Sequence, residues 1–405
     1  MIHRQWPHNQ IKKRVICHNY AITATADFFY RMKRIYLLLL ALFSLACSSE
    51  RPSLKAFSKE LYTPRYAHGF TLCTTEEGES TLLSTASPWQ GAVEPTRLLI
   101  RRNGEPLPKG FTGQVIEGEA KRVVCMSSSY IAMLDKVGAV DAVVGVSGID
   151  FISNPTINAR RAEIGDVGYD GNLNYELVVA LDPDLVLLYG VSNASEMEAR
   201  LKELGIPYVY VGEYLEEHPL GKAEWMIFVA ELVGRRQEAE ARFQPMAERY
   251  NAIAHTTYEG LKPRVMFNSP YRDNWFMPPA TSYLVQLVTD AGGEYIYRAD
   301  DGDNRSDVID LEEAYLLASK ADVWLNPGVI FSLDELCHRF PRFADVKAVR
   351  ERKVWNNNAR LSPAGGNDFW ETGVVEPDVV LRDLQHLLHP TLDPTYQFVY
   401  HHRLQ

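Results

Sequence analysis

Cysteine is scarce in this chain of 405 residues, which contains five of them. After Cys47 only Cys73, Cys125 and Cys337 remain, too few and too scattered for a disulfide framework or a CxxC metal site. Cys125 lies inside an apolar run, which favours a buried free thiol, and a Cys73 to Cys125 bridge stays open as the alternative. The sequence therefore excludes the small, disulfide-stapled class of protein.

Positive charge is also in deficit, since 42 Lys and Arg stand against 52 Asp and Glu, for a net charge of -10. Nucleic acid and an anionic bilayer would both repel such a chain as main partners, whereas an acidic surface suits basic docking pockets. Hydrophobic residues make up 46% and charged residues 23%, which is typical of a globular protein. The length suits two lobes that each bury a core.

The sequence lacks the short motifs of common α/β enzymes. GxGxxG after a strand, GxxxxGK[ST], GxSxG and HExxH are all missing, which counts against an enzyme although doubly wound sheets do house dehydrogenases and hydrolases. Capture of a bare zinc or manganese ion would need several histidines and carboxylates around one point. We expect neither a metal site nor a cofactor, because the histidines of the mature chain fall mostly outside the predicted binding loops: His68, His218, His255, His338, His386, His389, His401 and His402.

The apolar run near the start is far shorter than the ~20 residues that a membrane-spanning helix needs. It extends from Ile35 to Ala46, follows Lys33 and Arg34, and ends in small residues, which is the order found in a signal peptide. We expect a signal peptide at residues 32–46. Translation is then expected to start at Met32, with residues 1–31 as a non-native upstream extension.

The context of Cys47 resembles a bacterial lipobox, in which the cysteine carries a diacylglycerol and becomes the first mature residue. The resemblance implies a membrane-anchored lipoprotein in the periplasm. Such boxes usually carry Leu three positions before the cysteine, where this chain has Ser44, and Leu45 stands one place late. Ordinary secretion is the alternative. Residues 47–60 are expected to form a flexible tether.

From Arg122 onward, short β-rich runs alternate with helical patterns, which predicts parallel sheets with crossover helices. The second half, from Pro263, repeats the order of the first, since Glu312 lies 48 positions after Arg264 and Glu176 lies 54 after Arg122. We predict an α/β fold of two Rossmann-like lobes, at residues 121–218 and 261–390, followed by a tail at 391–405. The predicted strands are 122–126, 142–146, 185–189, 208–211, 264–267, 295–297, 322–325 and 353–355, and the predicted helices are 130–137, 175–181, 195–204, 283–291, 311–318 and 333–340.

A strongly helical segment, residues 219–260, separates the two lobes. Apolar residues such as Phe243, Ala247 and Tyr250 recur there on one face at helical spacing, which predicts a long backbone helix. Pro245 should kink or break that helix at a cost of ~3 kcal/mol, so two helices are possible.

Before the first lobe, the runs 70–73, 80–83 and 97–100 look like antiparallel strands between turn-forming residues. They predict an N-terminal β appendage at residues 61–120.

The segment from Asn172 to Leu188, NLNYELVVALDPDLVLL, resembles a signature of class III periplasmic binding proteins, and the segment from Asp310 to Leu325 fits its second-lobe counterpart. The likeness covers residues 120 to 390. These proteins serve ABC importers for ferric siderophores, haem and vitamin B12, and share two α/β lobes joined by a rigid helix. The resemblance implies a monomeric substrate-binding protein that passes a metal chelate or corrinoid to an ABC permease. A lipid-anchored module that binds a glycan or a protein is the alternative.

In that family one surface glutamate of each lobe docks with arginines of the permease, and the matching positions here are Glu176 and Glu312. Two distant carboxylates, each meeting a guanidinium bidentately, would fix the orientation of docking. The alternative is that each acid merely stabilises the first turn of a helix through the helix dipole, although that effect does not require a matched pair.

In an open α/β sheet the ligand lies outside the carboxyl ends of the strands, so residues that follow predicted strands are the candidates to bind it. Tyr and Trp can cover a flat macrocycle or a catecholate, while Arg and hydroxyl groups can take peripheral carboxylates. Helix capping and surface packing are alternatives for each of them, and siderophore, haem and corrinoid all stay open as cargo. The candidate ligand-binding residues are Ser127, Ser128, Ser129, Tyr130, Tyr169, Tyr189, Asn268, Tyr271, Arg272, Trp275, Asn326, Asn357 and Arg360.

Overall fold

The computed structural model describes residues 51–191, 193, 196–297 and 307–405. The expected signal peptide and Cys47 lie outside these residues. In the part of the chain that is described, no helix combines the length and the apolar character needed to cross a membrane. The same part brings no three His, Cys, Asp or Glu side chains together in a way that could hold a metal ion.

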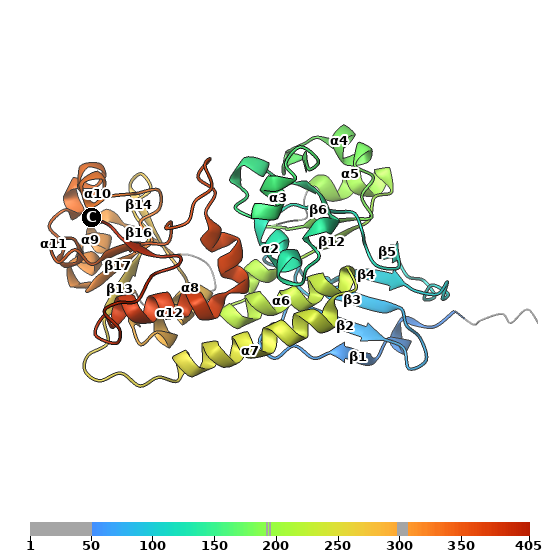
Figure 1. The fold of residues 1–405 in the computed structure, drawn as a ribbon, viewed down its shortest axis with the longest axis horizontal. Coiled ribbons are helices and arrows are strands. Elements are labelled where there is room, and N and C mark those ends of the chain that lie inside the picture. The colour runs from blue at the N-terminus through green and yellow to red at the C-terminus, as the bar shows by residue number, and fades with distance from the viewer. Residues whose placement is uncertain (1–50, 192, 194–195, 298–306) are drawn as a thin grey trace, which may run out of the picture. The chain divides into compact units, whose positions relative to one another are not determined.

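The chain begins with a five-stranded sheet whose strands follow one another in sequence order (Figure 1). Neighbours are antiparallel except for the last pair, which is parallel. Three of these strands cover the runs predicted from the sequence, and alternate side chains of β2 are buried, as expected for a sheet with one face against a core. The strands are β1 (Lys59–Tyr62), β2 (Phe70–Thr74), β3 (Thr81–Thr85), β4 (Thr96–Arg101) and β5 (Gln114–Glu117).

The first lobe is built on a parallel sheet of order β12-β11-β6-β7-β8. All four residues of β7 and of β11 are buried, because helices or loops cover both faces. The strands are β6 (Val123–Cys125), β7 (Val143–Val146), β8 (Gly165–Asp166), β11 (Leu185–Leu188) and β12 (Tyr208–Tyr210), with a small ribbon of β9 (Gly168–Tyr169) and β10 (Asn172–Leu173). The helices are α2 (Ser128–Lys136), α3 (Pro155–Ala159), α4 (Tyr175–Ala180) and α5 (Glu196–Leu204).

The second lobe has a sheet of order β15-β13-β17-β18-β19, parallel except for β19. Its strands are β13 (Arg264–Phe267), β15 (Glu294–Tyr295), β17 (Val323–Leu325), β18 (Val354–Asn356) and β19 (His402–Arg403), with a separate pair of β14 (Asn274–Met277) and β16 (Asp307–Asp310). Its helices are α8 (Tyr283–Asp290), α9 (Leu311–Lys320), α10 (Leu333–Arg339), α11 (Lys347–Arg350) and α12 (Pro377–Leu388). The segment expected as a tail, 391–405, therefore contributes a strand to this sheet.

The predicted fold class, two parallel-sheet lobes with a linking helical segment and an N-terminal sheet, is confirmed. The linking segment is divided into α6 (Pro219–Leu232) and α7 (Arg236–Ala254), which pack side by side (Figure 1). Two helices are present, as the sequence allowed, but the chain turns at Gly234, whose φ of 70° suits glycine, and Pro245 lies within α7 and does not break it. Burial of Phe243, Met246 and Ala247 around the proline offsets the hydrogen bond that it removes.

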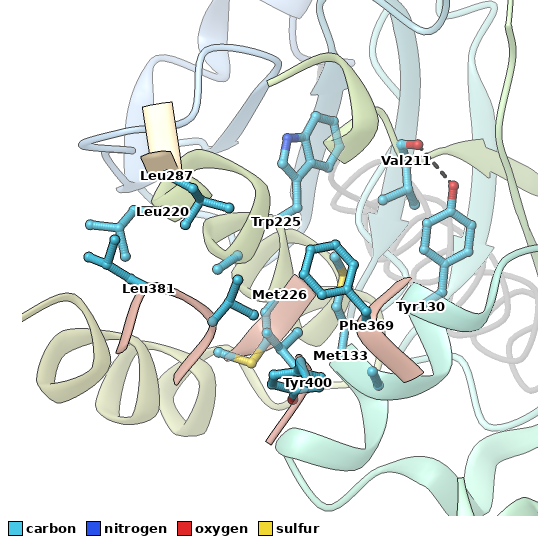
Figure 2. Packing of buried hydrophobic residues seen from close by; sticks show 14 of the residues in the cluster. Tyr130, Met133, Val211, Leu220, Trp225, Met226, Leu287, Phe369, Leu381 and Tyr400 are labelled. Atoms are coloured by element: carbon cyan, nitrogen blue, oxygen red, sulfur yellow. Dashed lines mark hydrogen bonds between the residues drawn. The ribbon is translucent and has the colours of Figure 1, made fainter. Parts of the chain in front are cut away.

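All fourteen residues of α6 are buried. Figure 2 shows its apolar side chains Leu220, Trp225 and Met226 packed among residues of both lobes, including Met133 and Leu381. The helix contacts α2 of the first lobe, α8 and α12 of the second, and β2 of the N-terminal sheet. It is therefore the common core element of all three parts.

Carboxylates of α6 and of the turn before it bind the main chain of the N-terminal segment. Glu224, which has no exposed surface, accepts hydrogen bonds from the N–H groups of Tyr66 at 2.8 Å and Ala67 at 2.7 Å. Glu216 accepts in the same way from the N–H of Gly69 at 2.9 Å and from Nε1 of Trp225 at 2.9 Å. Hydrogen bonds to charged groups are stronger than neutral ones, so these contacts fix the N-terminal sheet on the interlobe helix.

Substitution of Glu224 by Ala is expected to lower the free energy of unfolding by about 3 kcal/mol, because it leaves buried N–H groups without an acceptor. Glu224→Gln keeps one acceptor oxygen and should cost less. Chemical denaturation measures both, with Glu248→Ala on the exposed face of α7 as the matched control. Equal losses for Glu224→Ala and Glu248→Ala would contradict the role given to Glu224.

Candidate functional site

A cavity of about 400 Å³ opens at the carboxyl ends of the strands in the first lobe. Parallel strands end at the same edge of a sheet, so the residues after β6, β7, β11 and β12 meet there. The residues that line it are Met126, Ser127, Ser128, Tyr130, Ser147, Phe151, Ile152, Tyr169, Tyr189, Val191, Glu213 and Tyr214.

Five of the six first-lobe candidates come together in this cavity: Ser127, Ser128, Tyr130, Tyr169 and Tyr189. The sixth candidate, Ser129, is buried instead, and its Oγ donates to Oε1 of Glu213 at 2.7 Å. Ser127 also caps α2 through a 3.4 Å hydrogen bond from the N–H of Ser129. Capping thus fixes the serine cluster at the wall of the cavity.

Sequence reasoning missed other residues of the wall. Ser147 directly follows β7, so the rule that selected Ser127 could have found it. Tyr214 and Val191 lie three or four residues beyond the ends of β12 and β11. Phe151 ends a short 3-10 helix, Ile149–Phe151, that follows β7, and no local sequence pattern indicates that its ring lies at the cavity.

Tyr130 forms part of the floor. Its ring is fully buried, and its hydroxyl lies 3.0 Å from the carbonyl oxygen of Val211 (Figure 2) and 3.2 Å from that of Leu188. Burial raises the pKa of this phenol well above its ordinary value, so it acts as a neutral donor. It connects α2 to the ends of β11 and β12.

Glu213 is a buried acid in the cavity wall, with 5% of its surface exposed. Its Oε2 atom has no hydrogen-bond partner among the described residues. Burial raises the pKa of Glu213, while Lys222 and the hydrogen bond from Ser129 oppose that rise. Lys222 itself donates to the main-chain oxygen of Glu213 at 3.2 Å and lies 4.5 Å from the ring centroid of Tyr283 on the second lobe.

In the second lobe, Asn268, Asn326 and Asn357 follow β13, β17 and β18, three neighbouring parallel strands. Asn268 and Asn326 have φ of 68° and 54°, a left-handed conformation that asparagine tolerates better than most residues. Oδ1 of Asn326 and Nδ2 of Asn357 are buried and have no partner in the part of the chain that the structure describes. The second lobe thus carries amide groups at its strand ends.

Three other second-lobe candidates lie on exposed loops. Tyr271 is 61% exposed, and the guanidinium of Arg272 lies 5.4 Å from its ring centroid. Arg360 forms a 2.9 Å ion pair with Asp368 and lies 5.6 Å from the ring centroid of Tyr400. The pairing with Asp368 offsets the positive charge that Arg360 could otherwise offer to a ligand.

The assignment of Trp275 to the binding site is wrong, because its ring is fully buried. Its Nε1 donates to the main-chain oxygen of Phe267 at 2.8 Å, and its ring packs against Trp324 and Phe343. Side chains alternate between the two faces of β14, and Trp275 occupies the inward face. Trp275 is therefore a core residue of the second lobe.

The two lobes also touch through a loop of the second lobe, residues 361–371. Oγ of Ser362 donates to the main-chain oxygen of Asp150 at 2.9 Å, and Oε2 of Glu371 accepts from the N–H of Ser153 at 2.8 Å. A Cβ atom on Gly366 would lie 1.8 Å from the main-chain oxygen of Phe151, so only glycine allows this approach. These contacts place the loop directly against the wall residue Phe151.

Glu176 and Glu312 occupy equivalent places, each as the second residue of a helix after a strand or ribbon, and both are exposed. Asn174 already caps α4 by accepting from the N–H of Leu177 at 3.0 Å, and Asp310 caps α9 by accepting from the N–H of Glu312 at 2.8 Å. Neither glutamate is needed as a cap.

Two parallel-sheet lobes, linked by a buried helix and carrying polar and aromatic side chains at their strand ends, define a two-lobed binding protein. The sequence model of one family, described as "Periplasmic binding protein", matches residues 123–360. The chain therefore belongs to the periplasmic binding protein family.

Named relatives and solved structures agree with this membership. An uncharacterized lipoprotein of Methanocaldococcus jannaschii is 28% identical over 311 residues, which are 73% of this chain and 72% of the relative. A cobalamin-binding protein of Halobacterium salinarum is 29% identical over 215 residues, or 52% of this chain and 55% of the relative. A periplasmic heme-binding protein from Pseudomonas aeruginosa shares the fold, with a TM-score of 0.53 at 16% identity over 71% of this chain and 98% of that structure.

Glu371 provides a pH test of the contact between the lobes. Burial raises the pKa of Glu371 to about 7, although the N–H of Ser153 opposes the rise. A raised pKa stabilises the fold fully below the ordinary value near 4.5, and that stabilisation is lost as the pH rises through 7. Glu371→Gln should therefore gain stability relative to the unsubstituted protein between pH 4.5 and 7.5, by about 3 kcal/mol in all.

Denaturant unfolding at a series of pH values measures this difference, with the exposed Glu163→Gln as the control. If the stability of Glu371→Gln relative to the unsubstituted protein changes no more with pH than that of Glu163→Gln does, the carboxyl of Glu371 does not titrate with a raised pKa.

Proposed function

We propose that this protein captures a bulky ligand, an iron chelate, haem or a corrinoid, between its two lobes and delivers it to an ABC permease. The observation that carries the proposal is the cavity at the strand ends of the first lobe, where five predicted residues meet. Hydroxyl groups of Ser127 and Ser128 and the rings of Tyr169 and Tyr189 combine polar contacts with flat apolar surface, as ligand sites commonly do. In this role the protein binds and releases its cargo unchanged, so it is not an enzyme.

The relatives support this choice of cargo, since one is named for cobalamin and one structure for heme. Both are large, flat, metal-bearing rings. The second-lobe candidates Asn268, Tyr271, Arg272, Asn326, Asn357 and Arg360 would contact the cargo from the other side. Trp275 has no part in this proposal.

Attachment to a membrane through a lipid on Cys47, with the mature protein in the periplasm, belongs to the same proposal. The lipobox-like sequence supports it, and so does the relative from Methanocaldococcus jannaschii that is named as a lipoprotein. A lipid anchor would keep the monomer close to its permease and raise the rate of delivery.

Delivery is proposed to use Glu176 and Glu312. Both side chains are free to meet a partner: the side chain of Glu312 is 83% exposed, and its contact with Arg342, at 3.8 Å, is loose. Exposed apolar residues accompany the two acids on the same helices, Val179 on α4 and Leu316 on α9. A pair of acids at equivalent places suits two guanidinium groups of a symmetric permease.

Titration of the purified protein with cobalamin, cobinamide, haemin and a panel of ferric siderophores tests capture. We expect saturable quenching of tryptophan fluorescence by one class, because Trp370, within the loop 361–371 that touches the first lobe, is 46% exposed. If none of these ligands quenches the fluorescence while circular dichroism shows that the protein is folded, the result would contradict the proposal and favour a module that binds glycan or protein.

The double variant Glu176→Ala, Glu312→Ala should reduce uptake of the bound cargo by at least about tenfold, while its affinity for the cargo stays within twofold. Uptake into proteoliposomes that contain the permease measures delivery, and fluorescence titration measures affinity. Glu313→Ala, an exposed neighbour on α9, is the matched control. A large loss of affinity in the double variant would place the glutamates in the binding site instead.

A further inference from the structure

The wall of the first-lobe cavity is poor in charge. Among the twelve described residues of the wall, Glu213 is the single acidic or basic residue, and the rest are Ser, Tyr and apolar side chains. Lys222 donates to the main-chain oxygen of Glu213 but does not line the cavity, so a carboxylate or another anion placed against this wall would find no cation in the lining to offset its loss of water. The charge balance of the wall therefore works against anionic cargo.

The acid itself has one unused hydrogen-bonding position. Oε1 of Glu213 accepts from Ser129, whereas Oε2 is buried without a partner among the described residues. A buried polar atom without a partner costs free energy, and a ligand group that pairs with it regains that cost on binding. Oε2 thus has an unused hydrogen-bonding position on a residue that lines the cavity.

The environment of Glu213 favours a neutral partner. Burial raises the pKa of the carboxyl, so its acid form is more accessible than on the surface. A carboxyl group in that form can donate and accept, as a carboxamide also can, and the two form a complementary pair. In the ionised form Oε2 still accepts from a carboxamide N–H but repels a carboxylate.

The second lobe carries the same chemistry independently. Oδ1 of Asn326 is an unpaired buried acceptor, and Nδ2 of Asn357 is an unpaired buried donor. The two residues follow neighbouring parallel strands, β17 and β18. An acceptor and a donor together match the N–H and C=O of carboxamide groups.

We infer that Glu213 is a specificity-determining residue that reads a carboxamide of the cargo, and that the cargo is a carboxamide-rimmed macrocycle of the corrinoid class. Haem carries two carboxylates and catecholate iron chelates are anionic, so neither finds a cation in the first-lobe wall, and Arg360 of the second lobe is already paired with Asp368. The aromatic rings of Phe151 and Tyr169, each about half exposed, supply flat surface for the macrocycle. This inference rests on the proposed function and assigns its cargo.

The test uses corrinoids that differ by one group. Intact cyanocobalamin and its monocarboxylic derivatives, in each of which one side-chain amide is hydrolysed to a carboxylate, are titrated calorimetrically into the purified protein. We expect one derivative to bind about tenfold more weakly than the intact corrinoid, because its carboxylate meets Glu213. Haemin and a ferric catecholate should bind more weakly still.

Substitutions of the acid identify the contact. Glu213→Gln retains an acceptor for Ser129 and offers an N–H to a ligand carboxylate. The monocarboxylic derivative that binds the unsubstituted protein most weakly should therefore bind this variant about as tightly as the other derivatives do. Glu213→Ala should weaken the intact corrinoid. Glu217→Gln, an exposed neighbour, is the control and should leave every affinity unchanged. Thermal unfolding shows that each variant is folded.

Several outcomes would overturn the inference and stay distinguishable from failure of the proposed function. Tight binding of haemin or a ferric chelate with no binding of corrinoids would refute the corrinoid assignment and leave a working binding protein. Equal affinities of all the monocarboxylic derivatives and the intact corrinoid would remove Glu213 as the specificity residue. Absence of binding by every probe would refute the proposed function itself.

Discussion

The complete burial of α6 is the constraint on which the rest of the structure depends. A helix whose fourteen residues are all buried must be covered on every side, and the first lobe, the second lobe and the N-terminal sheet each supply part of the cover. Its acidic residues Glu224 and Glu231 then need buried partners, which the N-terminal segment provides through main-chain N–H groups, Thr81 and Arg102. The N-terminal sheet is accordingly part of the core, and its position follows from the polar side chains of one helix.

The sequence predicts the repeated elements of the lobes well, because continuous apolar runs such as those of β7 and β11 occur where helices and loops cover both faces of a parallel sheet. It fails for short or irregular elements. β19 has two residues, too few for any periodicity, and its place beside β18 is decided by tertiary contacts. Pro245 shows the same limit, since its local cost to the helix is outweighed by burial of neighbours that only the fold brings together.

The candidate site, too, could be predicted from the sequence only in part. Topology alone says that residues after parallel strands share an edge, and this is enough to gather Ser127 and Tyr189 at one cavity. It cannot say which way a side chain faces, so Trp275, an aromatic residue at a plausible place, turns into the core. Nor can it reveal Glu213, whose proposed role follows from its burial and from the one oxygen that has no partner among the described residues.

Both lobes pack against the same helix, α6, and they contact each other again through Gly366 and Glu371. Because these contacts already fix the lobes, few residues need to lose conformational freedom when a ligand binds. A pre-organised site loses less free energy on binding than one that must close around its cargo. It also has less freedom to adjust to different cargoes. Discrimination must then come from the groups already in the wall of the first-lobe cavity, which are hydroxyls, rings, apolar side chains and a single buried acid. In such a site the pairing of one unpaired oxygen weighs heavily, since the described residues that line the cavity include no cation to compensate for a mismatched ligand.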